Sequence, residues 1–270
     1  MSKLKKALDK ARETRQQEFS PAAAVNTDES SADNNEHFNQ QHKVDPSQAQ
    51  TRISACDLRQ LRNNKIIFDC QSLAAADQVK ILRTQILDNF KEIQGNSLLL
   101  TSPTAGTGTT LTAINLALSM AQEINRTVLL VDADLRHPSV HNYFGLTAER
   151  GLSDYLLGKA DLPELLINPG FDKLTILPGG EPLPNSTELL GAPRMESLVS
   201  EMKTRYADRF LIFDSSPLLS CADALVFSNF IDSVLLVVEA EKNSRREIKQ
   251  AMELLQDKPV LGSILNKVRN

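Results

Sequence analysis

The stretch "SLLLTSPTAGTGTTLT" (97–112) decides the fold, because it runs from an apolar strand through a glycine loop into a helix. Gly106 and Gly108 can adopt backbone angles closed to other residues, which lets consecutive N–H groups of the loop converge on phosphate oxygens. The helix that follows adds the positive end of its dipole. This layout predicts a phosphate-binding loop.

The loop departs twice from the strict pattern GxxxxGK[ST]. Pro103 stands at the first glycine and Thr109 at the lysine, whereas Thr110 keeps the hydroxyl that would ligate Mg²⁺. By pattern alone, the loop is a nucleotide site, a site that has lost its chemistry, or a tight turn. A unit charge about 4 Å from a phosphate oxygen contributes about 4 kcal/mol at an effective dielectric of about 20, so losing it weakens binding or transfer by up to about a thousandfold. Arg136, or a lysine of an adjacent subunit, is a candidate replacement.

Short apolar runs alternate with helical stretches from residue 97 onward. The runs of strand length are 97–101, 127–132, 173–177, 209–214, 233–238 and 260–265, and the helical stretches are 110–124, 187–205 and 243–256. Near-continuous apolar strands separated by helices predict an α/β fold, a mostly parallel sheet covered by helices on both faces. Ligands of such sheets bind at the carboxyl ends of the strands.

Polar side chains follow three of these strands. Asp132 ends one strand and is followed by Asp134 and Arg136, Asp214 ends another, and Asn266 ends the last. Two carboxylates in alternate positions can orient Mg²⁺ and its waters or accept a proton from a hydroxyl. A single aspartate at a strand end is more often a cap or turn residue. The three acidic residues Asp132, Asp134 and Asp214 beside a glycine loop favour a nucleotide site. The Asn266 amide either reads a nucleobase edge or belongs to a C-terminal turn.

The chain divides by composition into a tail and a domain. None of the 11 glycines precedes Gly95, so the first 94 residues lack the tight turns of a compact α/β domain. We expect a basic helix at 1–18, a flexible linker at 19–51, a helical segment at 52–94 and an NTPase-like domain at 95–270. The basic helix either docks on an acidic partner or membrane surface, or is simply a solvated helix.

Charge, cysteines and hydropathy exclude several classes of protein. A net charge of −4 gives no reason to expect nucleic-acid binding. The three cysteines are scattered and match neither a disulfide framework nor a zinc site. No apolar run approaches the roughly 20 residues that span a bilayer, and the N-terminus lacks a signal-peptide core. We therefore expect a cytoplasmic protein without a transmembrane segment.

Four further motifs accompany the loop in a recognisable order. They are "VDADLRHP" (131–138), "LPGGEPLPNSTELL" (177–190), "FLIFDSSPLL" (210–219) and "LNK" (265–267). Over residues 75–268 the chain resembles the bacterial tyrosine kinases of capsule and exopolysaccharide loci. The basic helix and the linker resemble the exopolysaccharide tyrosine-autokinase branch. This family belongs to the P-loop class that includes chromosome-partitioning ATPases.

The resemblance implies a P-loop NTPase-like kinase that transfers the γ-phosphate of Mg-ATP to tyrosine. The carboxylates of the catalytic set would be Asp132, Asp134 and Asp214, and the Mg²⁺ set Thr110, Asp132 and Asp214. ATP or ADP would be held by the loop together with Arg136 and Asn266, the loop residues being Thr104, Ala105, Gly106, Thr107, Gly108, Thr109, Thr110 and Leu111.

The resemblance also implies assembly. Asp77, Lys80 and Arg83 align with the family's Glu-x-x-Arg-x-x-Arg motif, which packs against a neighbouring subunit in a ring, and every sign of charge is kept. The alternative is charge pairing within one helix. The implied partner is the cytoplasmic tail of a membrane polysaccharide co-polymerase, which would place the protein at the inner face of the membrane.

Two departures from the family keep other functions open. The loop lysine is absent, and the tyrosines are Tyr143, Tyr155 and Tyr206, so none lies in the C-terminal cluster that the family autophosphorylates. The first alternative is a degenerate nucleotide-binding regulator or scaffold of a co-polymerase. The second is a partitioning-type ATPase, although Thr104 and Ala105 provide no lysine near the start of the loop. The third is a structural role without nucleotide.

Overall fold

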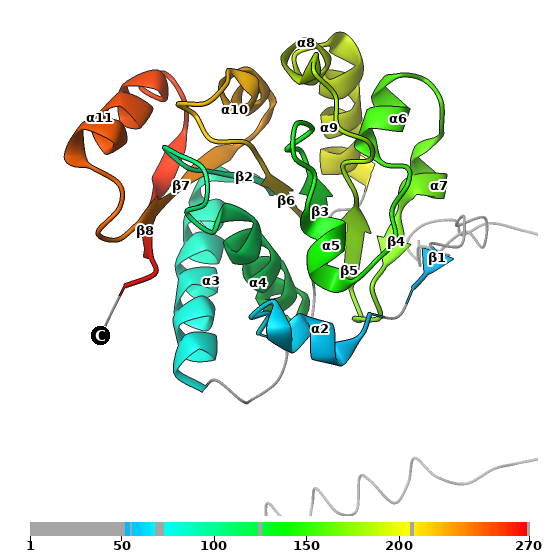
Figure 1. The fold of residues 1–270 in the computed structure, drawn as a ribbon, viewed down its shortest axis with the longest axis horizontal. Helices are drawn as coiled ribbons and strands as arrows, with labels where there is room; N and C mark the ends of the chain where they lie inside the picture. Colours follow the sequence, from blue (N-terminus) through cyan, green and yellow to red (C-terminus); the bar gives the residue numbers. More distant parts are fainter. Residues whose placement is uncertain (1–51, 55, 68–72, 124–125, 206–207, 269–270) are drawn as a thin grey trace, which may run out of the picture. The chain divides into compact units, whose positions relative to one another are not determined.

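An eight-stranded sheet forms the centre of the fold, in the order β1-β4-β5-β3-β6-β2-β7-β8 (Figure 1). Among the strands that the structure describes, β4 and β5 pair antiparallel and the other neighbours are parallel. The strands are β1 (Arg52–Ile53), β2 (Ser97–Thr101), β3 (Thr127–Asp132), β4 (Ile167–Asn168), β5 (Leu174–Leu177), β6 (Arg209–Asp214), β7 (Ser233–Glu239) and β8 (Val260–Asn266). The expected α/β fold with a mostly parallel sheet is confirmed.

The computed structural model describes residues 52–54, 56–67, 73–123, 126–205 and 208–268, which belong to the unit formed by residues 47–270. The expected basic helix at 1–18 and linker at 19–51 lie outside the described residues. The helices are α2 (Leu58–Asn63), α3 (Leu73–Ile93), α4 (Thr109–Ala121), α5 (Val140–Phe144), α6 (Leu152–Leu156), α7 (Leu162–Leu165), α8 (Ser186–Leu190), α9 (Pro193–Arg205), α10 (Asp223–Phe227), the 3₁₀ helix η2 (Ser228–Phe230) and α11 (Arg245–Leu254).

Helices cover both faces of the sheet because its central strands are apolar on both faces. Within β2, Leu98 and Leu100 pack into one core with Ile86 of α3 and Leu116 of α4. Leu99 points the other way, into a second core that includes side chains of α9 and α10. Figure 1 shows α3 and α4 side by side on one face and α9 and α10 on the other. Alternation along each strand therefore builds two cores from one sheet.

Three predicted strands, 97–101, 127–132 and 209–214, match β2, β3 and β6 residue by residue. The single helix expected over 187–205 is wrong: α8 ends at Leu190 and α9 begins at Pro193. Proline has no N–H to continue a helix and suits the first helical position. Gly191, between the two helices, lies so close to Val226 that a Cβ would meet Val226 Cγ1 at 2.6 Å. The segment 52–94 is helical in α2 and α3 but also contributes the edge strand β1.

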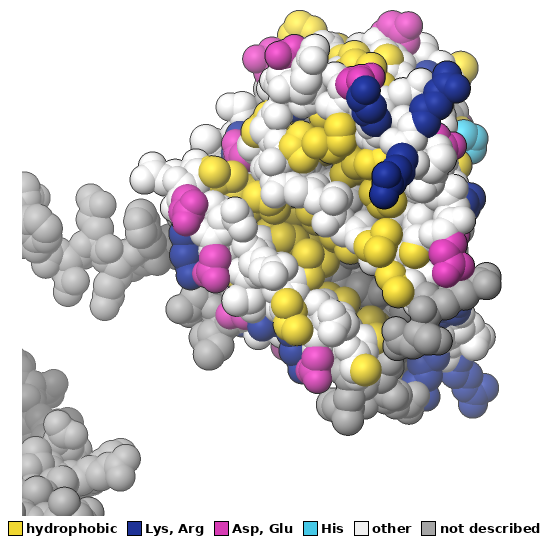
Figure 2. Space-filling view, turned by 90° about the vertical axis from the view of Figure 1, so that its left-hand side faces the viewer, with side chains coloured by type: hydrophobic (Ala, Val, Ile, Leu, Met, Phe, Trp, Pro, Cys, Tyr) yellow, Lys and Arg dark blue, Asp and Glu magenta, His cyan; other side chains and the backbone are white. Residues whose placement is uncertain are grey.

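The other edge of the sheet is β8, which is less covered than the central strands. Leu265 on β8 is 60% exposed, and Met252 and Leu254 on α11 are also exposed. Figure 2 shows hydrophobic side chains gathered over much of the face that carries β8 and α11. Within the described residues, no helix combines the length and the apolar character needed to cross a membrane.

Candidate functional site

The strand ends singled out in the sequence meet at one edge of the sheet. In the parallel pairing of β3 with β6, Asp132 lies opposite Asp214. In the pairing of β7 with β8, Glu239 lies opposite Asn266. Because β2 lies between β6 and β7, the loop that follows Thr101 emerges between these two pairs. The topology thus gathers acidic and amide side chains around the glycine loop.

The loop has the backbone that its glycines allow. Gly106 and Gly108 have φ angles of 79° and 91°, in the left-handed region that favours glycine. Gly108 is the N-cap of α4 and, being glycine, makes no side-chain cap hydrogen bond. The first N–H groups of a helix have no partner within it. The N-terminus of the 13-residue helix α4 therefore offers free donors and a positive dipole end to an anion at the loop.

Thr109 turns inward instead of reaching towards a ligand. It is only 9% exposed, and its hydroxyl lies 3.0 Å from the hydroxyl of Thr107. The position that carries a lysine in the strict loop pattern is thus filled by a short side chain that contacts the loop itself. Any cation that acts on phosphates here has to come from another part of the fold or from an adjacent subunit.

Asp132 is fully buried, and one of its two carboxylate oxygens has hydrogen-bond partners. Its Oδ2 accepts hydrogen bonds from the backbone N–H groups of Ser139, at 2.8 Å, and Val140, at 2.9 Å. Its Oδ1 has no hydrogen-bond partner among the described residues. Burial raises the pKa of Asp132 to about 7, against the opposing effect of the two N–H donors. The free oxygen is an acceptor held ready for a ligand.

Asp214 repeats this arrangement on β6. It is 1% exposed, and its Oδ1 also lacks a partner within the described part of the chain. Burial, followed by repulsion from Asp132, raises the pKa of Asp214 well above its usual value, although a hydrogen bond from the Thr110 side chain opposes this. Two neighbouring buried carboxyls with unpartnered oxygens disfavour each other's ionised form, and a bound cation would favour the ionised forms of both.

A magnesium ion fits this donor set. Mg²⁺ is usually held by one or two carboxylates together with waters and substrate phosphates. The described residues contain no group of three or more His, Cys, Asp or Glu side chains placed to hold a metal. Asp132, Asp214 and the Thr110 hydroxyl therefore suit an ion that a nucleotide would help to hold, and not one caged by the protein alone.

Asp134 and Arg136 extend the site beyond β3. Asp134 Oδ1 accepts from the backbone N–H groups of Arg136, at 3.3 Å, and His137, at 3.1 Å, and burial raises the pKa of Asp134. The Arg136 guanidinium binds Asp223 through Nε at 3.1 Å and Nη2 at 3.2 Å, and also contacts the Thr187 hydroxyl. Arg136 is thus engaged with the start of α10, where Asp223 is fully buried.

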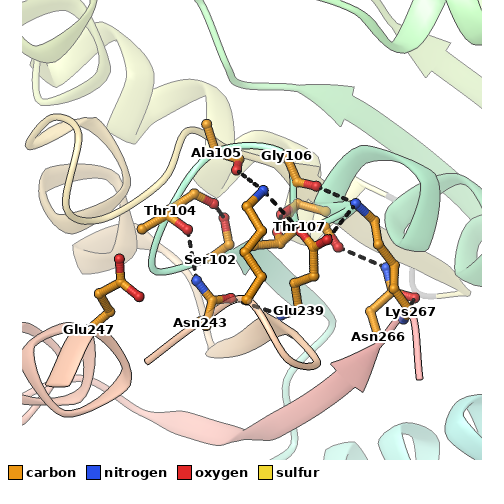
Figure 3. Close-up of polar contacts among 12 residues, drawn as sticks. Ser102, Thr104, Ala105, Gly106, Thr107, Glu239, Asn243, Glu247, Asn266 and Lys267 are labelled. Atoms are coloured by element: carbon orange, nitrogen blue, oxygen red, sulfur yellow. Dashed lines mark hydrogen bonds and ion pairs between the residues drawn. The ribbon is translucent and has the colours of Figure 1, made fainter. Parts of the chain in front are cut away.

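Side chains from the end of β8 and from the segments just after β7 and β8 hold the loop (Figure 3). Asn266 Nδ2 donates to the carbonyl of Thr107 at 2.8 Å, and Asn243 Nδ2 donates to the Thr104 hydroxyl at 2.7 Å. Lys267 Nζ lies 2.6 Å from the Gly106 carbonyl, and Lys242 Nζ lies 3.3 Å from the Ala105 carbonyl. Sequence reasoning found Asn266 but missed the other three, although the polar run after each strand was the available signal.

Both lysines also contact Glu239, the last residue of β7. Lys242 Nζ lies 3.1 Å from Glu239 Oε2, and Lys267 Nζ lies 3.2 Å from Glu239 Oε1. Hydrogen bonds from the two ammonium groups lower the pKa of Glu239, although desolvation opposes this. The two cations outnumber the one carboxylate with which they form ion pairs, and Lys242 also acts electrostatically on Glu247 of α11.

The residues expected at a subunit interface lie on α3. Lys80 Nζ pairs with Asp77 Oδ1 at 3.3 Å on the exposed face of the helix. Arg83 points inward: its guanidinium donates to the Ser119 carbonyl at 2.9 Å and pairs with Glu123 at 3.0 Å. Asp77 and Lys80 form the intrahelical pair, while Arg83 joins α3 to α4.

Comparison with known proteins identifies close relatives. The family model described as an AAA domain matches residues 100–259. The tyrosine-protein kinase YwqD of Bacillus subtilis is 34% identical over 210 residues, which cover 77% of this chain and 87% of YwqD. Among solved structures, the kinase domain of the Escherichia coli tyrosine kinase ETK superposes with a TM-score of 0.70 at 32% identity, covering 76% of this chain and 81% of that one.

Two further structures add to this picture. The chimerical protein CapA2B2 has a TM-score of 0.71 at 28% identity and covers 80% of this chain and 93% of its own. MinD of Pyrococcus horikoshii, solved with Mg-ADP, has a TM-score of 0.51 at 24% identity, covering 62% of this chain and 68% of its own. The last similarity concerns the fold alone, and it shows that a protein of this fold binds a nucleotide together with Mg²⁺.

Proposed function

Because the chain belongs to the family of bacterial tyrosine-protein kinases, we propose that it binds ATP or ADP with Mg²⁺ at the glycine loop and transfers the γ-phosphate of ATP to tyrosine in exopolysaccharide or capsule synthesis. One observation carries the proposal. Two buried carboxylates with unpartnered oxygens, Asp132 and Asp214, lie at the same edge of the sheet as an uncapped helix N-terminus. This places acceptors for a cation beside donors for phosphates.

The roles of the residues follow from their positions. The free N–H groups of the loop and of α4 orient the phosphates. Thr110, Asp132 and Asp214 would hold Mg²⁺, which would supply positive charge to offset that of the phosphates. Asp134 is the candidate to accept the proton of the attacking tyrosine, because burial raises its pKa towards a range useful for a general base. The site of phosphorylation is a tyrosine of a partner or of another copy of the chain.

A second function, that of a nucleotide-binding regulator without phosphotransfer, is favoured by one observation. Thr109 is turned against Thr107 and contributes no charge to the transition state, where a loop lysine stabilises the transferring group. Binding depends less on that lysine than transfer does, because backbone N–H groups and the helix end remain. In this alternative, nucleotide binding would control a polysaccharide co-polymerase by assembly.

The proposed partner is the cytoplasmic tail of a membrane polysaccharide co-polymerase, which would hold the protein at the inner face of the membrane. The assembly proposed with it is a ring in which Asp77 and Lys80 on the exposed face of α3 meet a neighbouring subunit. The exposure of this pair supports that role.

Phosphotransfer and binding are tested together on the full chain. We expect Mg²⁺-dependent binding of ATP by calorimetry and transfer of radiolabelled phosphate to a Glu-Tyr copolymer, tested with and without the partner tail. Asp214→Asn removes one carboxylate and should abolish the Mg²⁺ dependence, while Asp208→Asn, in the turn just before β6 and at the opposite end of that strand from Asp214, serves as the control. Binding without transfer under every condition would favour the regulator, and absence of binding would rule out both functions.

A further inference from the structure

We propose that Lys242, from the turn after β7, supplies the positive charge to the nucleotide phosphates that Thr109 does not supply. The inference rests on the proposed nucleotide site and names the residue that completes it. It answers a specific chemical need, because a phosphate loop without a lysine still has to offset the charge of a bound triphosphate.

The position of Lys242 is the first argument. Its ammonium lies 3.3 Å from the Ala105 carbonyl. It also lies over Gly106: a Cβ built on this glycine would meet Lys242 Nζ at 3.3 Å, and no other atom of the described residues, apart from the two chain neighbours, lies within 4 Å. Ala105 and Gly106 are central residues of the loop whose backbone cradles phosphates in the pattern GxxxxGK[ST]. The cation is therefore already at the mouth of the loop.

The freedom of Lys242 is the second argument. Its side chain is 52% exposed, and its two polar contacts measure 3.3 Å and 3.1 Å. A lysine on a flexible four-carbon stem can exchange such contacts for a phosphate oxygen by rotating about its own bonds. This rotation requires no change in the backbone of the turn. The turn itself stays fixed to the loop through Asn243, which binds Thr104 at 2.7 Å.

The neighbouring Lys267 is held differently. Its ammonium lies 2.6 Å from the Gly106 carbonyl, and the adjacent Asn266 binds the Thr107 carbonyl, so both residues fix the loop from β8. We assign Lys267 to positioning the loop and to neutralising Glu239. Glu239 pairs with both ammonium groups, at 3.1 Å to Lys242 and 3.2 Å to Lys267, so one carboxylate serves two cations. A phosphate oxygen at the loop would supply Lys242 with a further anionic partner.

Arg136, one of the two candidate cations from the sequence, is bound to another part of the fold. Its guanidinium makes two hydrogen bonds to Asp223, a residue that is fully buried. Moving Arg136 to the loop would leave that carboxylate without its charged partner in the interior, which is strongly unfavourable. Lys242 instead contacts Glu239, which Lys267 also contacts, and the Ala105 carbonyl.

The test measures ATP affinity in the full chain by calorimetry in the presence of Mg²⁺. We expect Lys242→Ala to weaken binding about tenfold, the lower part of the range for a unit charge at about 4 Å, because the side chain is half exposed. Lys242→Met keeps most of the stem and should weaken binding equally. The matched control is Lys249→Ala, which removes an exposed lysine of α11 that faces Glu253 and should change nothing.

Rescue distinguishes a missing charge from a damaged loop. Thr109→Lys combined with Lys242→Ala should restore affinity to within about threefold of the wild type, because a cation then reaches the phosphates from the usual position. Thermal melts establish that each variant folds.

The proposal is overturned if Lys242→Ala and Lys242→Met bind ATP as Lys249→Ala does. It is equally overturned if Lys267→Ala weakens ATP binding and Lys242→Ala does not. The same holds if Thr109→Lys raises ATP affinity in the wild type but does not raise it in Lys242→Ala. Absence of ATP binding by the wild type would overturn the proposed nucleotide site itself, and this inference with it.

Discussion

The amide nitrogen of Asn266 donates a 2.8 Å hydrogen bond to the carbonyl of Thr107, although 159 positions separate the two residues. The end of the last strand thereby fixes the glycine loop that follows β2. Asn266 Nδ2 also occupies the space where a side chain at position 108 would start, since a Cβ on Gly108 would lie 2.4 Å from it. Loop shape and strand end depend on each other at this point.

Replacement of Gly108 by alanine should disrupt the loop for two reasons. The φ angle of 91° is unfavourable for a residue with a Cβ by about 1–2 kcal/mol, and the new methyl group would displace Asn266. We expect nucleotide binding to fall below detection by calorimetry and the free energy of unfolding, measured with urea, to drop by roughly 2–3 kcal/mol.

Gly158→Ala provides the matched control. Gly158 has a comparable φ of 73°, but a Cβ there would meet only Arg194 Nη1, at 4.0 Å. It should therefore show the backbone cost alone, about 1–2 kcal/mol, with unchanged nucleotide binding. Equal losses of stability and binding in the two variants would show that contact with Asn266 is irrelevant.

Asp132 makes the stability of the nucleotide-free protein depend on pH. Its pKa is raised by burial to about 7 in the folded protein, against about 3.9 in an unfolded chain. Between these values the folded state holds a proton that the unfolded state has lost, so this residue's contribution to stability falls as the pH rises towards 7. The slope is roughly 1.4 kcal/mol per pH unit in that window.

Asp132→Asn removes this titration and keeps an oxygen for the N–H groups of Ser139 and Val140. Urea unfolding from pH 5 to pH 8 without Mg²⁺ should show the variant gaining stability relative to the wild type as the pH rises. Parallel curves for the two proteins would contradict the raised pKa. Asp232→Asn is the control: burial opposes, but Lys203 and the donors at Asn96 and Ser97 lower the pKa of Asp232. This carboxyl is therefore ionised in both the folded and the unfolded state from pH 5 to pH 8, and the curve of Asp232→Asn should stay parallel to that of the wild type.

Arg136 should matter first for stability. Asp223 is fully buried, and although burial alone raises its pKa, hydrogen bonds from Ser186, Thr187 and Arg136 lower it below its usual range. Arg136→Ala removes the charged partner, and we expect a loss of roughly 2 kcal/mol in urea unfolding. Asp223→Asn added to Arg136→Ala should recover part of that loss. Unchanged stability with lost ATP binding would instead place Arg136 on the nucleotide.

Much of the sheet was predictable because buried parallel strands are continuous apolar runs. That is why 97–101, 127–132 and 209–214 match the observed strands, and why Asp132 and Asp214 could be placed at one edge before any geometry was known. The helices of four or five residues, such as α5, α6 and α10, are too short to show a full hydrophobic period. The strand β1, with two residues, is also too short to be predicted from a sequence pattern.

The contacts of the cations at the loop could not be predicted from the sequence, because they depend on geometry that no local pattern encodes. Lys242 reaches Ala105 across 137 positions, from a turn in which Glu241 has a φ of 62°. Lys267 likewise has a φ of 58° just beyond β8. Arg136 looked available because its partner Asp223 is 87 positions away. Strand order decides all three, and it becomes known only when the sheet is assembled.

The charged residues of α3 lead us to expect that one substitution abolishes self-association without changing the free energy of unfolding. Asp77 and Lys80 form an exposed pair on the helix surface, which contributes only a few tenths of a kcal/mol to folding. Lys80→Glu places two like charges one turn apart on the face proposed to meet a neighbouring subunit. We expect it to abolish self-association in sedimentation velocity while shifting the free energy of unfolding by less than about 0.5 kcal/mol.

Arg83 should behave in the opposite way. Its side chain is 17% exposed and joins α3 to α4 through the Ser119 carbonyl and Glu123. Arg83→Ala should therefore cost roughly 1–3 kcal/mol in urea unfolding, because a hydrogen-bonded and partly buried ion pair is lost. Lys91→Glu, on the exposed last turn of α3 and paired with Asp88, is the control for charge reversal alone. If Lys91→Glu disperses the oligomer as Lys80→Glu does, the effect is general repulsion and the α3 pair has no specific role in assembly.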